Sequence, residues 1–243
     1  MPANIESLLT CMATMKEDYV RSPNASVRSS SFIYILHQYC IAQLRQAISP
    51  EFGVQVIPLA DMNRPVNSTN YPRVRIDPEK LQLMQEVALF GSHKNKNTDI
   101  VLSHFSNGPQ IIIGIRSQMS SVGKNIENYY EGIIGECISL HDRFPMAVIG
   151  YVYLLPTCSI KPGVDEVPDL EKAERLFSKI TSRPDWRSAH DKYEHFAFLK
   201  VDFTTPTPTL LPTLPELEIG SFFDKLIETY NDRNVFNQIE RSV

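Results

Sequence analysis

Two residues of opposite charge stand on neighbouring apolar runs in the middle of the chain. Asp99 opens the run DIVLSHF (99–105), and Arg116 lies near the end of the run QIIIGIRSQ (110–118). Because side chains alternate along a strand, Arg116 and Gln118 share one face of the second run. A carboxylate can hold a divalent metal ion, and an arginine can clamp a phosphate with two hydrogen bonds. The pair therefore indicates metal-assisted chemistry on a phosphate ester.

The two runs predict a β-hairpin that would bring these charges together. The residues between them include Asn107-Gly108, and Asn-Gly between apolar runs is a strong hairpin signal. In a bent hairpin, an acid at the start of one strand and a charged group on the next strand can face the same metal ion. We therefore expect Asp99 and the face of Arg116 to converge at one edge of the hairpin.

The segment before the hairpin predicts a helix. Asp77-Pro78-Glu79 combines a capping Asp, a Pro at the first helical position and an acid in the first turn. The predicted helix runs to Phe90, and Gly91 follows as its stop. Glu86 would lie on this helix, where we expect it to be a solvated surface residue.

The remaining segments predict helices and strands on both sides of the hairpin. Periodicity and turn residues predict helices at 1–20, 31–48, 122–141, 169–180 and 221–230. Extended runs predict strands at 54–59, 146–156 and 195–203. An antiparallel hairpin followed by crossover helices gives an α/β fold with a mixed β-sheet flanked by helices.

The length of the chain predicts one domain. A chain of 243 residues can bury one substantial core, and we find no internal repeat. We expect a helical N-terminal region over 1–76 and a core over 77–203. The stretch TTPTPTLLPTLPE holds four prolines, so 204–243 is expected to be an extended connector followed by a C-terminal helix.

The composition is that of a globular protein. It is 42% hydrophobic and 21% charged, without an apolar run near the ~20 residues of a membrane helix. The first residues lack a signal-peptide pattern, so we expect a cytoplasmic location and no membrane partner. The net charge of −4 does not exclude nucleic acid, because a local positive groove is sufficient for binding. The four cysteines form no CxxC pair and predict neither a zinc site nor a disulfide framework.

The central segment resembles a family of nucleases. Asp-Ile-Val-Leu, a turn and Ile-Gly-Ile-Arg-Ser-Gln resemble the hairpin of the PD-(D/E)XK superfamily. The stretch SQMSSVGKN…NYYEGIIGE…LHDRFP…GYVYLLP is similar to restriction endonucleases of type II, and the resemblance covers 99–156. It implies a restriction-endonuclease-like fold and Mg²⁺-dependent hydrolysis of double-stranded DNA at a specific site. It also implies a homodimer, since a two-fold symmetric DNA site is matched by a two-fold symmetric protein.

The chain departs from the family pattern at three positions. Thr98 precedes the acid in place of Pro, Gly114 stands at the second acid position, and Arg116 replaces the lysine. Some restriction enzymes take the missing acid from the next helix. The resemblance therefore implies that the metal ligands are Asp99, Glu131 and Glu136, with Glu131 the first candidate for the second acid.

Further residues have expected roles in catalysis or DNA binding. With Arg in place of Lys, Lys124 could supply the ammonium group, and Gln118 could orient the attacking water. Ser120, Ser121 and Lys124 lie where the next helix begins, and helix N-termini favour phosphate. Lys94 and Lys96 precede Asp99 and either contact DNA or belong to a solvated turn.

Two other functions remain open from the sequence. Gly114 and Arg116 favour a nuclease fold that has lost catalysis and serves as a DNA-binding or assembly subunit of a defence system. The other is an unrelated interaction protein of mixed α/β fold. Carboxylates that converge within ~5 Å would favour catalysis, whereas an ion pair between Asp99 and Arg116 that fills the site would favour the inactive subunit.

Overall fold

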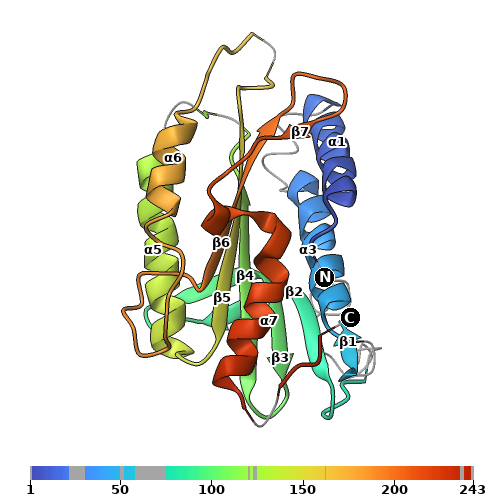
Figure 1. Ribbon diagram of the computed structural model, residues 1–243, viewed down its shortest axis with the longest axis vertical. Coiled ribbons are helices and arrows are strands. Elements are labelled where there is room, and N and C mark those ends of the chain that lie inside the picture. The colour runs from blue at the N-terminus through green and yellow to red at the C-terminus, as the bar shows by residue number, and fades with distance from the viewer. Residues whose placement is uncertain are drawn as a thin grey trace, which may run out of the picture.

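A seven-stranded mixed sheet runs through the middle of the molecule, with helices on both sides (Figure 1). The computed structural model describes residues 2–21, 31–49, 52–57, 75–119, 121–122, 125–161, 163–235 and 238–241. In order along the sheet and the chain, the strands are β1 (Val54–Val56), β2 (Leu81–Phe90), β3 (Asn95–His104), β4 (Gly108–Ser117), β5 (Val148–Pro156), β6 (His195–Asp202) and β7 (Thr209–Leu210). The prediction of a mixed α/β fold is thereby confirmed.

The pairing of the strands changes at β4. β2, β3 and β4 form an antiparallel meander, and β3 and β4 are the predicted hairpin. β4, β5 and β6 are parallel, because helices connect them across the sheet. At the two edges, β1 pairs parallel with β2, and β7 pairs antiparallel with β6.

Helices cover both faces of the sheet. α1 (Ile5–Arg21) and α3 (Tyr34–Ala47) lie at the right of Figure 1, while α5 (Ile126–Arg143) and α6 (Leu170–Phe177) lie at the left. α7 (Phe222–Arg233) packs with α1 and α3 in the same hydrophobic core. Short 3₁₀ turns complete the helical segments: η1 (Ser31–Ile33), η3 (Pro215–Leu217) and η4 (Ile219–Ser221).

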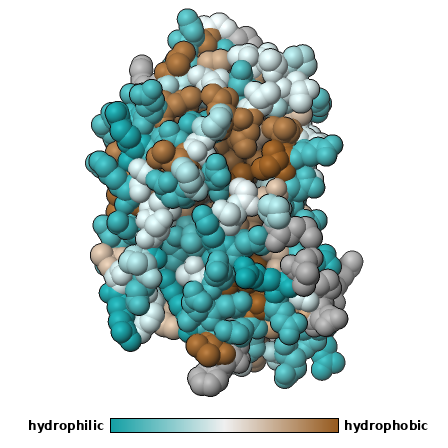
Figure 2. Space-filling model, in the orientation of Figure 1, coloured by the Kyte–Doolittle hydropathy of each residue, from teal (hydrophilic) through white to brown (hydrophobic). Residues whose placement is uncertain are grey.

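The alternation of side chains along β4 divides the interior into two cores. Ile111, Ile113 and Ile115 face α1, α3 and α7, whereas Ile112 faces α5 and α6. On the face shown in Figure 2, hydrophilic side chains cover most of the surface and apolar ones gather in the upper half. None of the helices in the described ranges combines the length and the apolar character that a bilayer crossing requires.

The predicted helix over 77–90 is wrong. Asp77 precedes a turn at Pro78 and Glu79, and Leu81–Phe90 is strand β2, which pairs antiparallel with β3 on both sides of Glu86. The segment LQLMQEVALF is rich in good helix formers, so local propensity favours a helix. Pairing with β3 and burial of Leu81 and Leu83 override that preference.

The other predicted elements differ from the structure mainly at their ends. The connector over 204–216 contributes the short edge strand β7, which pairs with Val201 and Asp202. Residues 58–74, which include the end of the strand predicted at 54–59, lie outside the described residues. All four cysteines are free, and Cys40 and Cys137 are buried.

Candidate functional site

β3 and β4 separate at Asp99. Toward this end of the hairpin the last paired residues are Ile100 and Ile113, while β4 continues to pair with β5 as far as Ser117. At the fork, Oδ2 of Asp99 accepts a hydrogen bond from the backbone N–H of Ile115. The carboxylate thus replaces a partner of the β-ladder, and this hydrogen bond fixes its position at the opening between the strands.

Glu86 brings a second carboxylate to the same place. It lies on β2 between two ladder pairs, Gln85–Ile100 and Val87–Thr98, and so stands opposite Asp99. Its backbone φ is 55°, a left-handed conformation that a residue other than Gly or Asn rarely adopts. Such a conformation costs of order 1–3 kcal/mol and persists only where the surrounding structure imposes it.

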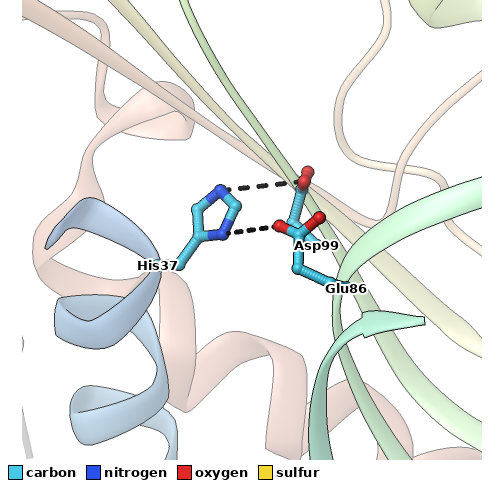
Figure 3. A group of neighbouring side chains, drawn as sticks. All are labelled: His37, Glu86 and Asp99. Atoms are coloured by element: carbon cyan, nitrogen blue, oxygen red, sulfur yellow. Dashed lines mark ion pairs between the residues drawn. The ribbon is translucent and has the colours of Figure 1, made fainter. Parts of the chain in front are cut away.

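His37 approaches both carboxylates from α3. Its Nδ1 lies 3.1 Å from Oε1 of Glu86, and its Nε2 lies 3.7 Å from Oδ1 of Asp99 (Figure 3). One ligand atom from each of the three residues can be chosen so that all lie within 4.8 Å of one another. Burial lowers the pKa of His37 to about 4, so the imidazole is neutral at neutral pH.

Glu136 reaches the site from α5, on the other side of the sheet. A Cβ atom placed on Gly114 would lie 3.4 Å from Oε1 of Glu136 and 2.5 Å from a ring carbon of Tyr151. Tyr151 and the Glu136 carboxylate therefore fill the space that a side chain at position 114 would need. Burial raises the pKa of Glu136, which makes its negative charge costly in the absence of a cation.

The neighbouring carboxylates contribute to a raised pKa at Asp99. Burial is the largest cause that raises the pKa of Asp99 to about 7, and the charges of Glu136 and Glu86 add to it. The hydrogen bond from Ile115 and the charge of Arg116 act in the opposite direction. Burial also raises the pKa of Glu86. A group of acids with raised pKa values favours a bound cation, because a cation stabilises their charged forms.

Two cations lie beside these acids. Arg116 and Lys96 both act to lower the pKa of Glu136, against the larger effect of burial. The guanidinium carbon of Arg116 lies 5.4 Å from the centre of the Tyr129 ring, which orients it by a cation–π contact. Among the ion pairs of the described residues, none joins Arg116 to Asp99.

Not all of the predicted site residues come together. The structure places Asp99, Arg116, Glu136 and Lys96 around the fork, as the pKa effects among them show. Glu131 is exposed on α5, and no hydrogen bond or ion pair joins it to a described residue of the fork. It lies five positions before Glu136, so the two side chains leave the helix in different directions.

The remaining predicted residues are held elsewhere or lie outside the description. Gln118 is buried, accepts a hydrogen bond from the hydroxyl of Tyr153 and donates one to the carbonyl of Ser121; its predicted role with water is untested. Lys94 is exposed in the turn between β2 and β3. Ser120 and Lys124 lie outside the described residues, so their predicted roles are untested.

His37 and Glu86 were not predicted as members of this site from the sequence. The available signal for His37 was a polar residue within the apolar face of the helix at 31–48, since it follows the buried Leu36 and precedes Cys40 by one turn. Glu86 was assigned to a solvated helix, whereas it stands on β2 beside a buried imidazole. The strand assignment is what brings its carboxylate to Asp99.

Comparison of the chain with protein-family models, with curated proteins and with solved structures finds no match.

Proposed function

We propose that the protein is a divalent-metal-dependent endonuclease of restriction type that hydrolyses phosphodiester bonds in double-stranded DNA. The observation that supports this most is the meeting of Asp99 and Glu86 at the fork between β3 and β4, with Glu136 on the other side. The sheet order, with an antiparallel meander followed by parallel crossover strands, is compatible with a restriction-endonuclease-like fold. The protein would act in the cytoplasm as a homodimer on a symmetric site.

The residues at the fork fit a divalent cation. Carboxylate oxygens are the ligands that Mg²⁺ prefers, and the raised pKa values of Asp99, Glu86 and Glu136 mean that a cation would stabilise their ionised forms. Mg²⁺ is the ion implied by the sequence resemblance. When bound, such an ion supplies a Lewis acid and lowers the pKa of a water molecule.

Arg116 and Lys96 are placed to act on the DNA backbone. Arg116 is permanently charged, and its contact with Tyr129 holds it in place to bind a phosphate oxygen and to stabilise charge that develops on the scissile phosphate. Lys96 has three rotatable donors and can assume the ammonium role that Arg116 cannot fill as a proton donor. Asp99 and Glu86 would hold the ion against the same phosphate.

The test is cleavage of mixed plasmid and phage DNA by the purified protein with Mg²⁺, with Mn²⁺ or with EDTA. We expect discrete fragments that require the metal ion, and a loss of at least about a hundredfold in Asp99→Asn, which removes a ligand charge without changing the size of the side chain. Glu131→Gln is the matched control, because Glu131 is exposed on α5, and its rate should stay within about threefold of the wild type. Cleavage that persists in Asp99→Asn would overturn the proposal.

A second candidate is a DNA-binding or assembly subunit that has the nuclease fold without catalysis. It is favoured by Gly114, where Tyr151 leaves no room for the usual carboxylate, and by Arg116 in place of the lysine. Salt-dependent binding of DNA without cleavage in either metal ion would favour this candidate. The described ion pairs do not include the Asp99–Arg116 pair that this function would lead one to expect.

A further inference from the structure

The side chain of His37 is buried among groups that do not satisfy its nitrogens. It is 1% exposed, and neither Nδ1 nor Nε2 makes a hydrogen bond of acceptable geometry. Each nitrogen nevertheless lies close to a carboxylate oxygen, Nδ1 to that of Glu86 and Nε2 to that of Asp99 (Figure 3). Buried polar groups in folded proteins are almost always paired, so this arrangement requires an explanation.

A simple ion pair does not explain the geometry. If His37 were a cation paired with the two acids, its N–H groups would be aligned with their oxygens. The Nδ1 to Oε1 distance of 3.1 Å is short enough for a hydrogen bond, yet the contact lacks the required alignment. A nitrogen and two carboxylate oxygens grouped this closely can instead serve as ligands of one cation.

The distances are close to those of a metal centre. Two ligands about 2.1 Å from one ion are about 3.0 Å apart when adjacent and about 4.2 Å apart when opposite. One nitrogen of His37 and one oxygen from each of Glu86 and Asp99 lie within 4.8 Å of one another. Side-chain rotations that shorten these separations would bring the three atoms around one ion.

We infer that His37 is a direct ligand of the ion at this site, and that the ion is a divalent transition metal such as Mn²⁺ in preference to Mg²⁺. Mg²⁺ selects oxygen ligands, whereas imidazole nitrogen suits first-row transition ions. Mn²⁺ also accepts carboxylates and water readily, which matches the two acids beside His37. The inference deepens the proposed function, with which it shares the site, but its test measures metal binding and does not depend on cleavage.

The first experiment is isothermal titration calorimetry of the full chain with MnCl₂ and with MgCl₂. We expect Mn²⁺ to bind at least about tenfold more tightly than Mg²⁺. In His37→Gln the affinity for Mn²⁺ should fall by about tenfold or more, while the affinity for Mg²⁺ changes by less than about threefold. His104→Gln is the matched control, because His104 lies at the far end of β3 and accepts a hydrogen bond from the backbone of Ser106.

The second experiment is pulsed electron paramagnetic resonance of the wild-type protein with bound Mn²⁺. A coupling to ¹⁴N that changes when the protein is labelled with ¹⁵N-histidine would show an imidazole ligand, and it should vanish in His37→Gln. This measurement on the wild type alone decides the question if His37→Gln does not fold. Tightly bound Mn²⁺ without nitrogen coupling, no Mn²⁺ binding, or an unchanged ratio of the two affinities in a folded His37→Gln would each overturn the inference.

The two proposals can fail separately. Nitrogen-coupled Mn²⁺ in a protein that cleaves no DNA would support His37 as a ligand and would rule out the proposed nuclease activity. Cleavage that depends on Asp99, with Mn²⁺ bound but not coupled to nitrogen, would support the nuclease and overturn the role of His37.

Discussion

Asp99 is a residue whose charge is costly in the folded protein without a cation. Its pKa rises from an ordinary value of 3.8 to about 7, first through burial and then through the charges of Glu136 and Glu86. A carboxyl group with a raised pKa in the folded state stabilises the fold below its unfolded pKa, and this contribution is lost as the pH rises through the folded pKa. The relevant window is therefore about pH 4 to pH 7.

This linkage predicts an effect of Asp99→Asn on stability. In EDTA, the free energy of unfolding of the wild type should fall between pH 5 and pH 8 by about 2 kcal/mol more than that of Asp99→Asn. The amide does not ionise, and it also removes a negative charge from beside Glu136. Urea denaturation at the two pH values measures the difference. Equal pH dependence of the two proteins would mean that Asp99 is already ionised at low pH.

At the scale of single elements, the ring of Tyr151 on β5 fills the space beside Gly114 on β4 and leaves no room for a side chain there. A Cβ atom there would lie 2.5 Å from a ring carbon of Tyr151, which is itself buried. We expect Gly114→Ala to lower the free energy of unfolding by about 1–3 kcal/mol, the usual cost of overpacking a core. It should also displace Glu136 and so weaken metal binding, which calorimetry can measure beside chemical denaturation.

Gly132 provides the control for that substitution. It lies in the interior of α5, and a Cβ atom there would meet nothing within 4 Å. Because Ala is the better helix former, Gly132→Ala should stabilise the protein by about 0.5–1 kcal/mol and leave metal binding unchanged. If both variants changed stability alike, the contact of position 114 with the Tyr151 ring would not be the cause of the destabilisation in Gly114→Ala.

The elements also show what the sequence could and could not predict. The hairpin of β3 and β4 was predicted from two β-branched runs around Asn107-Gly108. Asp99 and Arg116 were predicted as site residues from their positions on that hairpin. β2 was missed because its residues favour a helix locally and become a strand only through pairing with β3. Because β2 was missed, Glu86 was not placed in the site. Its orientation toward Asp99 depends on the irregular backbone of β2 at that residue.

His37 and Glu136 could not be chosen with certainty from spacing alone. A histidine on a helix reveals a ligand role only when the packing of that helix against the sheet is known. Likewise, the choice between Glu131 and Glu136 depends on which face of α5 turns toward β4, and both faces of this helix carry acids. Three-dimensional packing of α3 and α5 on opposite sides of the sheet supplies that information.

At the scale of the molecule, a buried ion network joins elements from both layers. Glu194, just before β6, accepts hydrogen bonds of 2.9 Å from Arg183 and 2.7 Å from Arg233, the last residue of α7. Arg183 also contacts His141 near the end of α5, and it bonds three backbone carbonyls of the segment before β6. The network thus holds α5, α7 and the sheet together away from the fork.

Removing one partner of this network should destabilise the whole fold. Arg183→Met would leave the fully buried Glu194 with one cation fewer, and such a loss typically costs about 3–5 kcal/mol. The exposed Arg187 gives the control, since Arg187→Met should change stability by less than about 0.5 kcal/mol. Chemical denaturation in EDTA measures both. A small effect of Arg183→Met would mean that Arg233 alone neutralises Glu194.

DNA binding by a protein of net charge −4 requires its positive charge to be local. The turn between β2 and β3 carries His93 and Lys94, and Lys96 follows at the start of β3, three positions before Asp99. These side chains would attract DNA phosphates to the neighbourhood of the fork. If Lys94 and Lys96 each neutralise a phosphate, they release counterions and contribute to the salt dependence of binding.

We therefore predict that Lys94→Ala/Lys96→Ala weakens binding of a DNA duplex in EDTA and lowers the slope of log affinity against log salt by about 1.8, or 0.9 for each phosphate contact. Fluorescence anisotropy over a range of salt concentrations measures this slope. Lys161→Ala/Lys179→Ala makes the same change in net charge at exposed positions outside the turn and should leave the slope unchanged. If both double variants lowered the slope equally, the net charge of the molecule and not the turn beside Asp99 would govern its attraction to DNA.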